Sequence, residues 1–160
     1  MKQIKIESSF TEYASVDELP EEVRELMKEA VKARQKAYAP YSKFHVGAAI
    51  LLDNGQIVTG SNQENASYPS GLCAERTAIY YAGAQYPNAI IKTMAITAAS
   101  QIHKTTGPIP PCGACRQTIS EYEMKQDVPI EIYFMGAEGR ILKSDSLANL
   151  LPFVFKKSAL

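Results

Sequence analysis

Three cysteines in two clusters constrain this chain more than any other feature of its sequence. The first cluster is Cys-Ala-Glu at positions 73–75, the second is Pro-Cys-Gly-Ala-Cys at positions 111–115, and together they hold every cysteine of the chain. An odd number of thiols makes a poor disulfide framework. Three thiolates suit a catalytic zinc ion, because such an ion keeps its fourth position for water. A fold that uses all three must bring Cys73 to Cys112 and Cys115.

Both clusters are expected at helix starts. Cys112 and Cys115 are three positions apart, so they face the same way in a first helical turn. Cys73 and Glu75 are two positions apart, so both serve one site only if Cys73 lies at the helix cap. Glu75 would then move protons to and from the water, and Arg76 would donate hydrogen bonds to sulfur. The sequence therefore predicts one catalytic zinc ion per chain.

Other interpretations explain fewer of these residues. Free cysteines are often buried as small apolar side chains, and a lone Cys-x-x-C occurs in redox proteins as well as in metal sites. Neither interpretation needs a third cysteine with a glutamate two residues away. A non-enzymatic module stabilised by zinc would need a fourth ligand, and the only histidines, His45 and His103, lie in neither cluster.

Composition narrows the class of protein. A chain of 160 residues with 46% hydrophobic residues is long and apolar enough for one folded domain. Its 17 Lys and Arg residues equal its 17 Asp and Glu residues, so it lacks the basic excess of a nucleic-acid-binding protein. No apolar run reaches the ~18 residues that suggest a membrane span. The first residues lack the apolar stretch of a signal peptide, so free thiols predict a reducing cytoplasm.

The pattern of apolar residues and turn formers predicts an α/β domain with a mixed sheet of roughly five strands. Strands are expected over residues 44–52, 57–59, 94–99, 130–135 and 141–142, with a hairpin turn at Asn54-Gly55. Helices are expected from a capping box at residues 15–18 to Pro40, from Cys73 to near Gly83, and over residues 112–121. Because strands and helices alternate after residue 94, part of the sheet should be parallel. Residues 1–17 are interpreted as an arm and residues 18–160 as one catalytic domain.

The two cysteine clusters resemble those of zinc-dependent nucleoside deaminases. Three further stretches are similar to the cytidine deaminase family: Tyr-Ser-Lys-Phe-His-Val-Gly-Ala-Ala at 41–49, Asn-Gln-Glu-Asn-Ala-Ser-Tyr-Pro at 62–69 and Leu-Leu-Pro-Phe-Val-Phe at 150–155. The resemblance spans about residues 25–155. It implies a three-layer αβα fold, zinc-dependent deamination of cytidine and deoxycytidine in pyrimidine salvage, and a homotetramer whose subunits share active sites.

The resemblance also implies a set of substrate-binding residues: Phe44, Asn62, Glu64, Ala66, Tyr68, Ala74 and Phe155. The two phenylalanines would pack on the base, and Asn62 and Glu64 would hold the ribose hydroxyls. The loop of Ala66 and Tyr68 would reach into a neighbouring subunit's pocket, while backbone groups near Ala74 and Cys112 would read the pyrimidine edge. Either phenylalanine can instead pack in the core, and the nearby Phe153 leaves open which ring meets the base.

Rival functions share parts of this pattern. A deaminase of a related aminonucleoside, such as blasticidin S, has the same zinc motifs, but Asn62, Glu64 and the C-terminal aromatic residues favour a plain nucleoside. A polynucleotide-editing deaminase usually has histidine as its first ligand and a basic surface, and this chain has neither. A zinc-stabilised binding module would have no use for Glu75. The expected partners are therefore a small nucleoside and further copies of the chain, with neither nucleic acid nor membrane.

Overall fold

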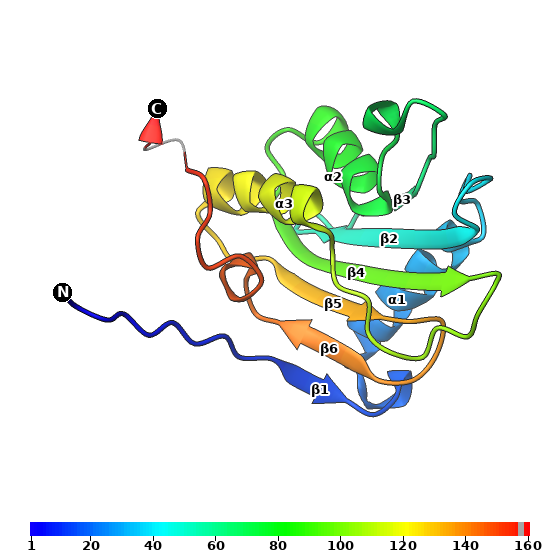
Figure 1. Cartoon of the computed structure of the whole chain (residues 1–160), viewed down its shortest axis with the longest axis horizontal. Helices are drawn as coiled ribbons and strands as arrows, with labels where there is room; N and C mark the ends of the chain where they lie inside the picture. The colour runs from blue at the N-terminus through cyan, green and yellow to red at the C-terminus, as the bar shows by residue number, and fades with distance from the viewer. Residues whose placement is uncertain (157–158) are drawn as a thin grey trace.

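A mixed sheet of six strands forms the middle layer of the computed structural model, which describes residues 1–156 and 159–160 (Figure 1). Its strands are β1 (Thr11–Tyr13), β2 (Phe44–Leu52), β3 (Ile57–Ser61), β4 (Ile91–Ser100), β5 (Glu131–Met135) and β6 (Ile141–Ser144). The helices are α1 (Glu21–Arg34), α2 (Ala74–Gln85) and α3 (Gly113–Gln126), with short 3-10 turns η1 (Val16–Glu18), η2 (Tyr68–Ser70) and η3 (Leu147–Asn149). The predicted α/β class is confirmed.

The strands are ordered β1-β6-β5-β4-β2-β3 across the sheet. β4 and β5 run parallel and α3 lies between them in the chain, so the predicted parallel part of the sheet is confirmed. The hairpin of β2 and β3 turns at Gly55, whose φ of +80° suits glycine. The sheet has one strand more than the roughly five predicted. The additional strand is β1, which pairs antiparallel with β6 although its three residues are too few to show an apolar alternation.

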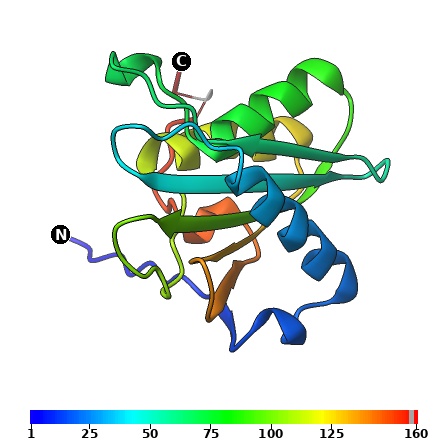
Figure 2. The same cartoon turned by 90° about the vertical axis from the view of Figure 1, so that its right-hand side faces the viewer.

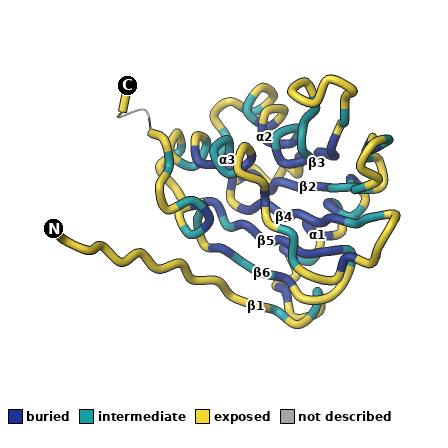
Figure 3. The backbone as a smooth tube through the Cα atoms, in the orientation of Figure 1, coloured by how far each residue is buried: buried dark blue, intermediate teal, exposed yellow. Residues whose placement is uncertain are grey.

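Side chains of β2 alternate between the two helical layers. Ala48, Ile50 and Leu52 belong to the core cluster that includes α2 and α3, whereas Ala49 and Leu51 belong to the cluster that includes α1. Figure 2 shows α1 and α2 on opposite faces of the sheet, and Figure 3 shows buried residues along β2, β4 and β5. The sheet is therefore covered on both sides, as the predicted three-layer αβα arrangement requires.

Two glycines allow helices to touch the sheet backbone. A Cβ atom at Gly47 would lie 2.1 Å from the carbonyl oxygen of Ala30 in α1. A Cβ atom at Gly60 would lie 2.5 Å from the carbonyl oxygen of Ala74, the first residue of α2. The second contact fixes the first turn of α2 directly on β3. The residues on either side of Ala74 are Cys73 and Glu75, so this contact also positions the first cysteine cluster.

The bounds of α1 differ from those predicted. Ser15 does not cap α1: its Oγ accepts a hydrogen bond of 3.2 Å from the N–H of Asp17 in η1, and Pro20 is the residue before α1. At its other end α1 stops at Arg34 rather than near Pro40, because Tyr38 donates its N–H to the carbonyl of Asn62 at 3.0 Å. This bond draws the chain away from helical geometry before the proline is reached.

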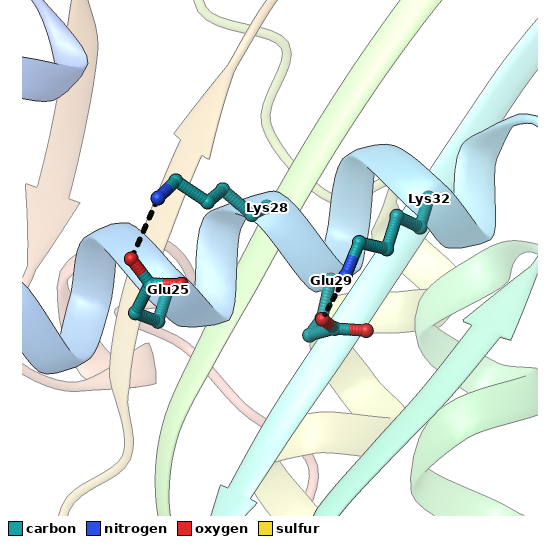
Figure 4. Close-up of polar contacts among 4 residues, drawn as sticks. All are labelled: Glu25, Lys28, Glu29 and Lys32. Atoms are coloured by element: carbon teal, nitrogen blue, oxygen red, sulfur yellow. Dashed lines mark hydrogen bonds and ion pairs between the residues drawn. The ribbon is translucent and has the colours of Figure 1, made fainter.

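The outer face of α1 is charged. Lys28 pairs with Glu25 and Lys32 pairs with Glu29, each at 2.6 Å and one helical turn apart (Figure 4). This is the solvent-facing side expected of an amphipathic helix whose other face covers a sheet. Within residues 1–156 and 159–160, no helix combines the length and apolar character that crossing a membrane requires.

Candidate metal centre and substrate site

Three sulfur atoms meet where α2 and α3 begin. Cys73 and Cys112 are the N-cap residues of these helices, both with extended backbones, and Cys115 is buried in the first turn of α3. The Sγ atoms of Cys73 and Cys112 are 3.8 Å apart, those of Cys112 and Cys115 are 3.4 Å apart, and all three lie within 4.8 Å of one another. Tetrahedral zinc with Zn–S bonds of 2.3 Å needs sulfurs roughly 3.8 Å apart. The three thiols therefore fit a zinc ion.

The thiols interact strongly with one another. A hydrogen bond from Cys115 lowers the pKa of the Cys73 thiol to about 5, and Arg76 acts in the same direction. The same contact with Cys73, together with burial, raises the pKa of Cys115. The pKa values of the two thiols are thus shifted in opposite directions. A dication favours the deprotonated form of every cysteine that binds it, so a bound zinc ion would lower the pKa of all three thiols.

Glu75 lies beside the sulfurs but outside the group that can hold the metal. It is the second residue of α2 and only 4% exposed. Burial, which removes the carboxylate from water, raises the pKa of Glu75 to about 7, and the charge of Cys73 acts in the same direction. A carboxyl group that titrates near neutral pH can accept and return a proton at little cost. Its environment therefore suits acid–base chemistry.

Arg76 places a cation next to the sulfur atoms. Its Nη2 lies 3.9 Å from the Sγ of Cys73 and 3.5 Å from the carbonyl oxygen of Gly71. Its Nε is buried and makes no hydrogen bond within the described part of the chain. A cation in the first turn of a helix opposes the helix dipole, so the attraction here comes from the thiolate. Arg76 is thus within reach of the sulfur to which it is predicted to donate hydrogen bonds, and its role at the metal stays a prediction.

Two residues of α3 that the sequence analysis missed hold the neighbouring backbone. The Nε of Arg116 donates to the carbonyl oxygen of Pro111 at 2.9 Å, and its Nη1 donates to that of Leu150 at 2.9 Å. The side-chain amide of Gln117 donates to the carbonyl oxygen of Phe155 at 3.0 Å. One signal in the sequence could have identified Arg116. A cation is unfavourable in the first turn of a helix, so an arginine there suggests a specific partner.

Asn62 and Phe44 are joined at the edge of the sheet. The side-chain Nδ2 of Asn62 donates to the carbonyl oxygen of Phe44 at 2.9 Å, and its Oδ1 accepts from the N–H of Val46 at 2.8 Å. The chain after Asn62 then pairs with the residue before Cys73, because Gln63 and Leu72 exchange two backbone hydrogen bonds of 2.9 and 3.0 Å. These contacts bring the predicted ribose-binding loop next to the first cysteine cluster.

Glu64 organises the turn that leads into β2. Its carboxylate accepts hydrogen bonds from the N–H groups of Tyr41 at 2.9 Å and Ser42 at 3.2 Å, and from the Ser42 hydroxyl. Burial alone would raise the pKa of Glu64, but these hydrogen bonds lower it below its ordinary value. The group is therefore ionised near neutral pH.

The remaining predicted contacts differ in exposure. Ala74 is fully buried, whereas Ala66 is exposed and Tyr68 is 77% exposed, its ring lying edge-on to that of Tyr41. Phe44 is half-buried and Phe155 is 62% exposed. Core packing within one chain therefore accounts for Phe155 poorly. The substrate roles of these residues stay predictions.

Comparison with known proteins gives a consistent result. The family model for the cytidine and deoxycytidylate deaminase zinc-binding region matches residues 20–130, which include both cysteine clusters. A cytidine deaminase of Sporosarcina psychrophila is 42% identical over 139 residues, covering 87% of this chain and 95% of that protein. A cytidine deaminase of Halalkalibacterium halodurans is 39% identical over 130 residues, covering 81% of this chain and 91% of that protein.

Solved structures give the same answer. A cytidine deaminase from Burkholderia pseudomallei superposes with a TM-score of 0.72 at 37% sequence identity, covering 86% of this chain and 100% of that chain. A cytidine deaminase from Mycobacterium tuberculosis superposes with a TM-score of 0.65 at 31% identity, covering 84% and 97% of the two chains. The likeness thus extends over the whole length of the first of these proteins and leaves a small part of this chain unmatched.

Proposed function

The chain belongs to the cytidine and deoxycytidylate deaminase family, and we propose that it converts cytidine and deoxycytidine to uridine and deoxyuridine with release of ammonia. The observation that carries this conclusion is the buried carboxyl of Glu75 beside three sulfurs at zinc-binding distances. The relatives described above are cytidine deaminases, which supports the nucleoside as substrate. The reaction is a hydrolysis in which a C4–O bond forms and the C4–N bond breaks.

Cys73, Cys112 and Cys115 would hold the zinc ion, which would supply a water acidic enough to serve as a nucleophile near neutral pH. Glu75 accepts the proton that the water gives up. It delivers that proton to N3 of the pyrimidine, then takes the second proton from the hydroxyl group added at C4 and delivers it to the leaving amine. The same carboxyl therefore acts as base and as acid, which a pKa near 7 favours.

The substrate contacts belong to this proposal. Phe44 and Phe155 would pack on the base, and Asn62 and Glu64 would hold the ribose hydroxyls. The hydrogen bond from Asn62 to the backbone of Phe44 supports a common site for base and sugar. Glu64 already accepts three hydrogen bonds, but a carboxylate offers about four lone-pair positions, so one remains for a hydroxyl. The backbone next to Ala74 would read the pyrimidine edge.

The direct test is the loss of ultraviolet absorbance when the purified protein is mixed with cytidine. We expect turnover with about one zinc ion per chain in protein purified without added metal. Blasticidin S serves as the comparison substrate, because a deaminase of that aminonucleoside would share the zinc site. Turnover of blasticidin S with none of cytidine would overturn the proposal, and so would activity in protein that holds almost no zinc.

We also propose a preference for nucleosides over nucleotides. The ionised carboxylate of Glu64, placed next to the sugar, would repel a phosphate dianion. Lys104, the basic residue of the loop before the second cysteine cluster, pairs with Glu138 at 2.5 Å and offers little compensation. Cytidine should therefore be processed with a higher kcat/KM than cytidine monophosphate. Equal values for the two would show that the carboxylate does not face the sugar.

A homotetramer with shared active sites is the proposed assembly. Tyr80 and Tyr81 on α2 are 46% and 58% exposed, and Tyr68 on the loop before it is 77% exposed. Exposed aromatic side chains are frequent at interfaces, and a dimer of dimers is a common closed arrangement.

Light scattering would give the mass of the assembly in solution. Mixing a Glu75→Gln chain with a chain altered at Tyr68 should restore part of the activity if subunits complete one another's pockets, and no recovery after proven exchange would contradict sharing.

The chain is proposed to act in pyrimidine salvage in the cytoplasm. This is a reducing compartment, in which its three cysteines would stay free of disulfide bonds.

We also propose that residues 1–17 form an arm and residues 18–160 form the catalytic domain. The start of the family match at residue 20 supports this division. The pairing of β1 with β6 ties the end of the arm to the sheet. Proteolysis that trims the exposed start but stops before β1 is the expected result.

A further inference from the structure

Arg116 joins two parts of the chain that the proposed site uses. One of its carbonyl acceptors is Pro111, which precedes the Cys112 ligand, and the other is Leu150, where the C-terminal segment begins. The guanidinium is partly buried, and no carboxylate of residues 1–156 or 159–160 forms an ion pair with it. Its contacts are therefore with backbone oxygens, which a planar fork of N–H groups can reach in two directions.

The bond to Pro111 fixes the direction of a neighbouring N–H group. The carbonyl of Pro111 and the N–H of Cys112 belong to one trans peptide unit, so they point in opposite directions. Arg116 holds that carbonyl toward α3, and the N–H must then point away from it. Within the described residues this N–H makes no hydrogen bond. It is thus available to the pyrimidine edge, which the proposed function brings to this place.

The second contact holds the aromatic C-terminal segment. Arg116 binds the carbonyl of Leu150 and Gln117 binds that of Phe155, so two adjacent residues of α3 hold both ends of residues 150–155. Phe153 and Phe155 are 83% and 62% exposed, so apolar packing within the chain does little to fix them. Core packing of Leu150 and its backbone bond to Leu147 also hold the first end of the segment, so Arg116 adds to that anchor while Gln117 holds the other end.

We propose that Arg116 is a positioning residue that sets both the Cys112 peptide and the aromatic segment against the substrate, with Gln117 acting on the segment alone. This inference rests on the proposed function. It requires that loss of Arg116 change turnover and substrate binding while the zinc stays bound, because all three ligands remain. Loss of Gln117 should change substrate binding alone.

Steady-state kinetics with cytidine separates these effects. We expect Arg116→Gln to lower kcat about 10-fold to 100-fold and to raise KM, with zinc still near one per chain. Arg116→Lys keeps the charge but lacks the fork, so it should recover only part of the loss. Gln117→Ala should raise KM several-fold with kcat nearly unchanged. The matched control is Lys125→Ala, which also removes a bond from α3 to a carbonyl, that of Pro87 at 3.1 Å, at the other end of the helix.

A kcat and KM for Arg116→Gln within twofold of the parent would overturn the inference, as would complete recovery by lysine. If Arg116→Gln does not fold, the other two variants test the inference. Arg116→Lys with the kcat and KM of the parent, or Gln117→Ala with an unchanged KM, would then overturn it. Hydrogen exchange provides a readout that does not depend on the substrate. Faster exchange at the N–H groups of Leu150 and Leu151, which bond to the carbonyl of Leu147, is the expected result in Arg116→Gln but not in Lys125→Ala, and unchanged exchange would contradict the restraint. A parent protein without activity on cytidine would instead refute the proposed function.

Discussion

The starts of α2 and α3 are alike in sequence and differ in use. Each helix has a cysteine at its N-cap with an extended backbone, and each has an arginine soon afterwards, Arg76 in α2 and Arg116 in α3. Both arginines oppose the helix dipole. Arg76 lies next to the sulfur of Cys73, whereas Arg116 binds backbone carbonyls.

Burial explains this difference. The first turn of α2 rests on β3 through the close contact at Gly60, and Glu75 is 4% exposed there. The equivalent residue of α3 is Ala114, which is exposed. A buried helix start can shift the pKa of a carboxyl group, and an exposed one has little means to do so. In our interpretation α2 therefore supplies the acid–base chemistry, and α3 supplies two ligands and holds the backbone around them.

The largest expected effect comes from removing the carboxyl at the start of α2, which the start of α3 lacks. Glu75→Gln should lower kcat by at least 10²–10⁴, because general acid–base catalysis is typically worth that factor, while zinc content stays near one per chain. Steady-state kinetics and metal analysis measure both quantities. Glu121→Gln, an equally conservative change at an exposed position of α3, is the control. Full activity of Glu75→Gln would mean that another group moves the protons.

Removing the metal tests the part that the two helix starts share. A ligand present at about a thousand times its Kd stabilises a protein by about 4 kcal/mol, so chelation should lower Tm by about 10 °C in a domain of this size. Cys115 is fully buried and Cys112 is exposed. Cys115→Ser should therefore lower Tm further than Cys112→Ser, although both should lose zinc. Equal Tm values with and without chelator would indicate that no metal joins the helices.

The raised pKa of Glu75 predicts a pH dependence in chelated protein. Burial lifts this pKa from an ordinary value of 4.5 to about 7, so between these values the folded chain binds more protons than the unfolded chain. The free energy of unfolding should therefore fall as pH rises through that window. Glu75→Gln has no such group, so above pH 7 it should be more stable than the parent by about 3 kcal/mol. Urea unfolding of both chelated proteins between pH 5 and 8 measures the difference, and parallel curves would contradict the burial argument.

Local patterns explain why much of the metal centre follows from the sequence. The three-residue spacing of Cys112 and Cys115 and the cap position of Cys73 are properties of one helical turn, so no tertiary information is needed to predict them. The hairpin at Gly55 is equally local. The hydrogen bond from Arg116 to Leu150 could not be predicted in this way. The two residues are 34 positions apart, and only the folded chain brings them together.

The same reasoning explains the misplaced boundaries. The apolar stripe of α1 continues past Arg34, but the hydrogen bond between Tyr38 and Asn62 ends the helix earlier. β1 is held by its pairing with β6 and has no pattern of its own. The sequence predicts that Asn62 binds substrate, but its side-chain amide also forms hydrogen bonds with the backbone of β2. Each of these features depends on a partner that is distant in the chain.

The smallest expected effect compares the two arginines directly. Arg76→Gln removes a cation from beside a thiolate, so nearby groups should lose protons less readily and the acidic limb of the kcat profile should move to higher pH by about one unit. Arg116→Gln removes a cation that binds carbonyl groups, so it should lower kcat at every pH without moving that limb. Profiles of both variants and the parent with saturating cytidine make the measurement. A shift of the same size in both variants would mean that the two charges act alike on the site. The different surroundings of the two arginines would then have no consequence for catalysis.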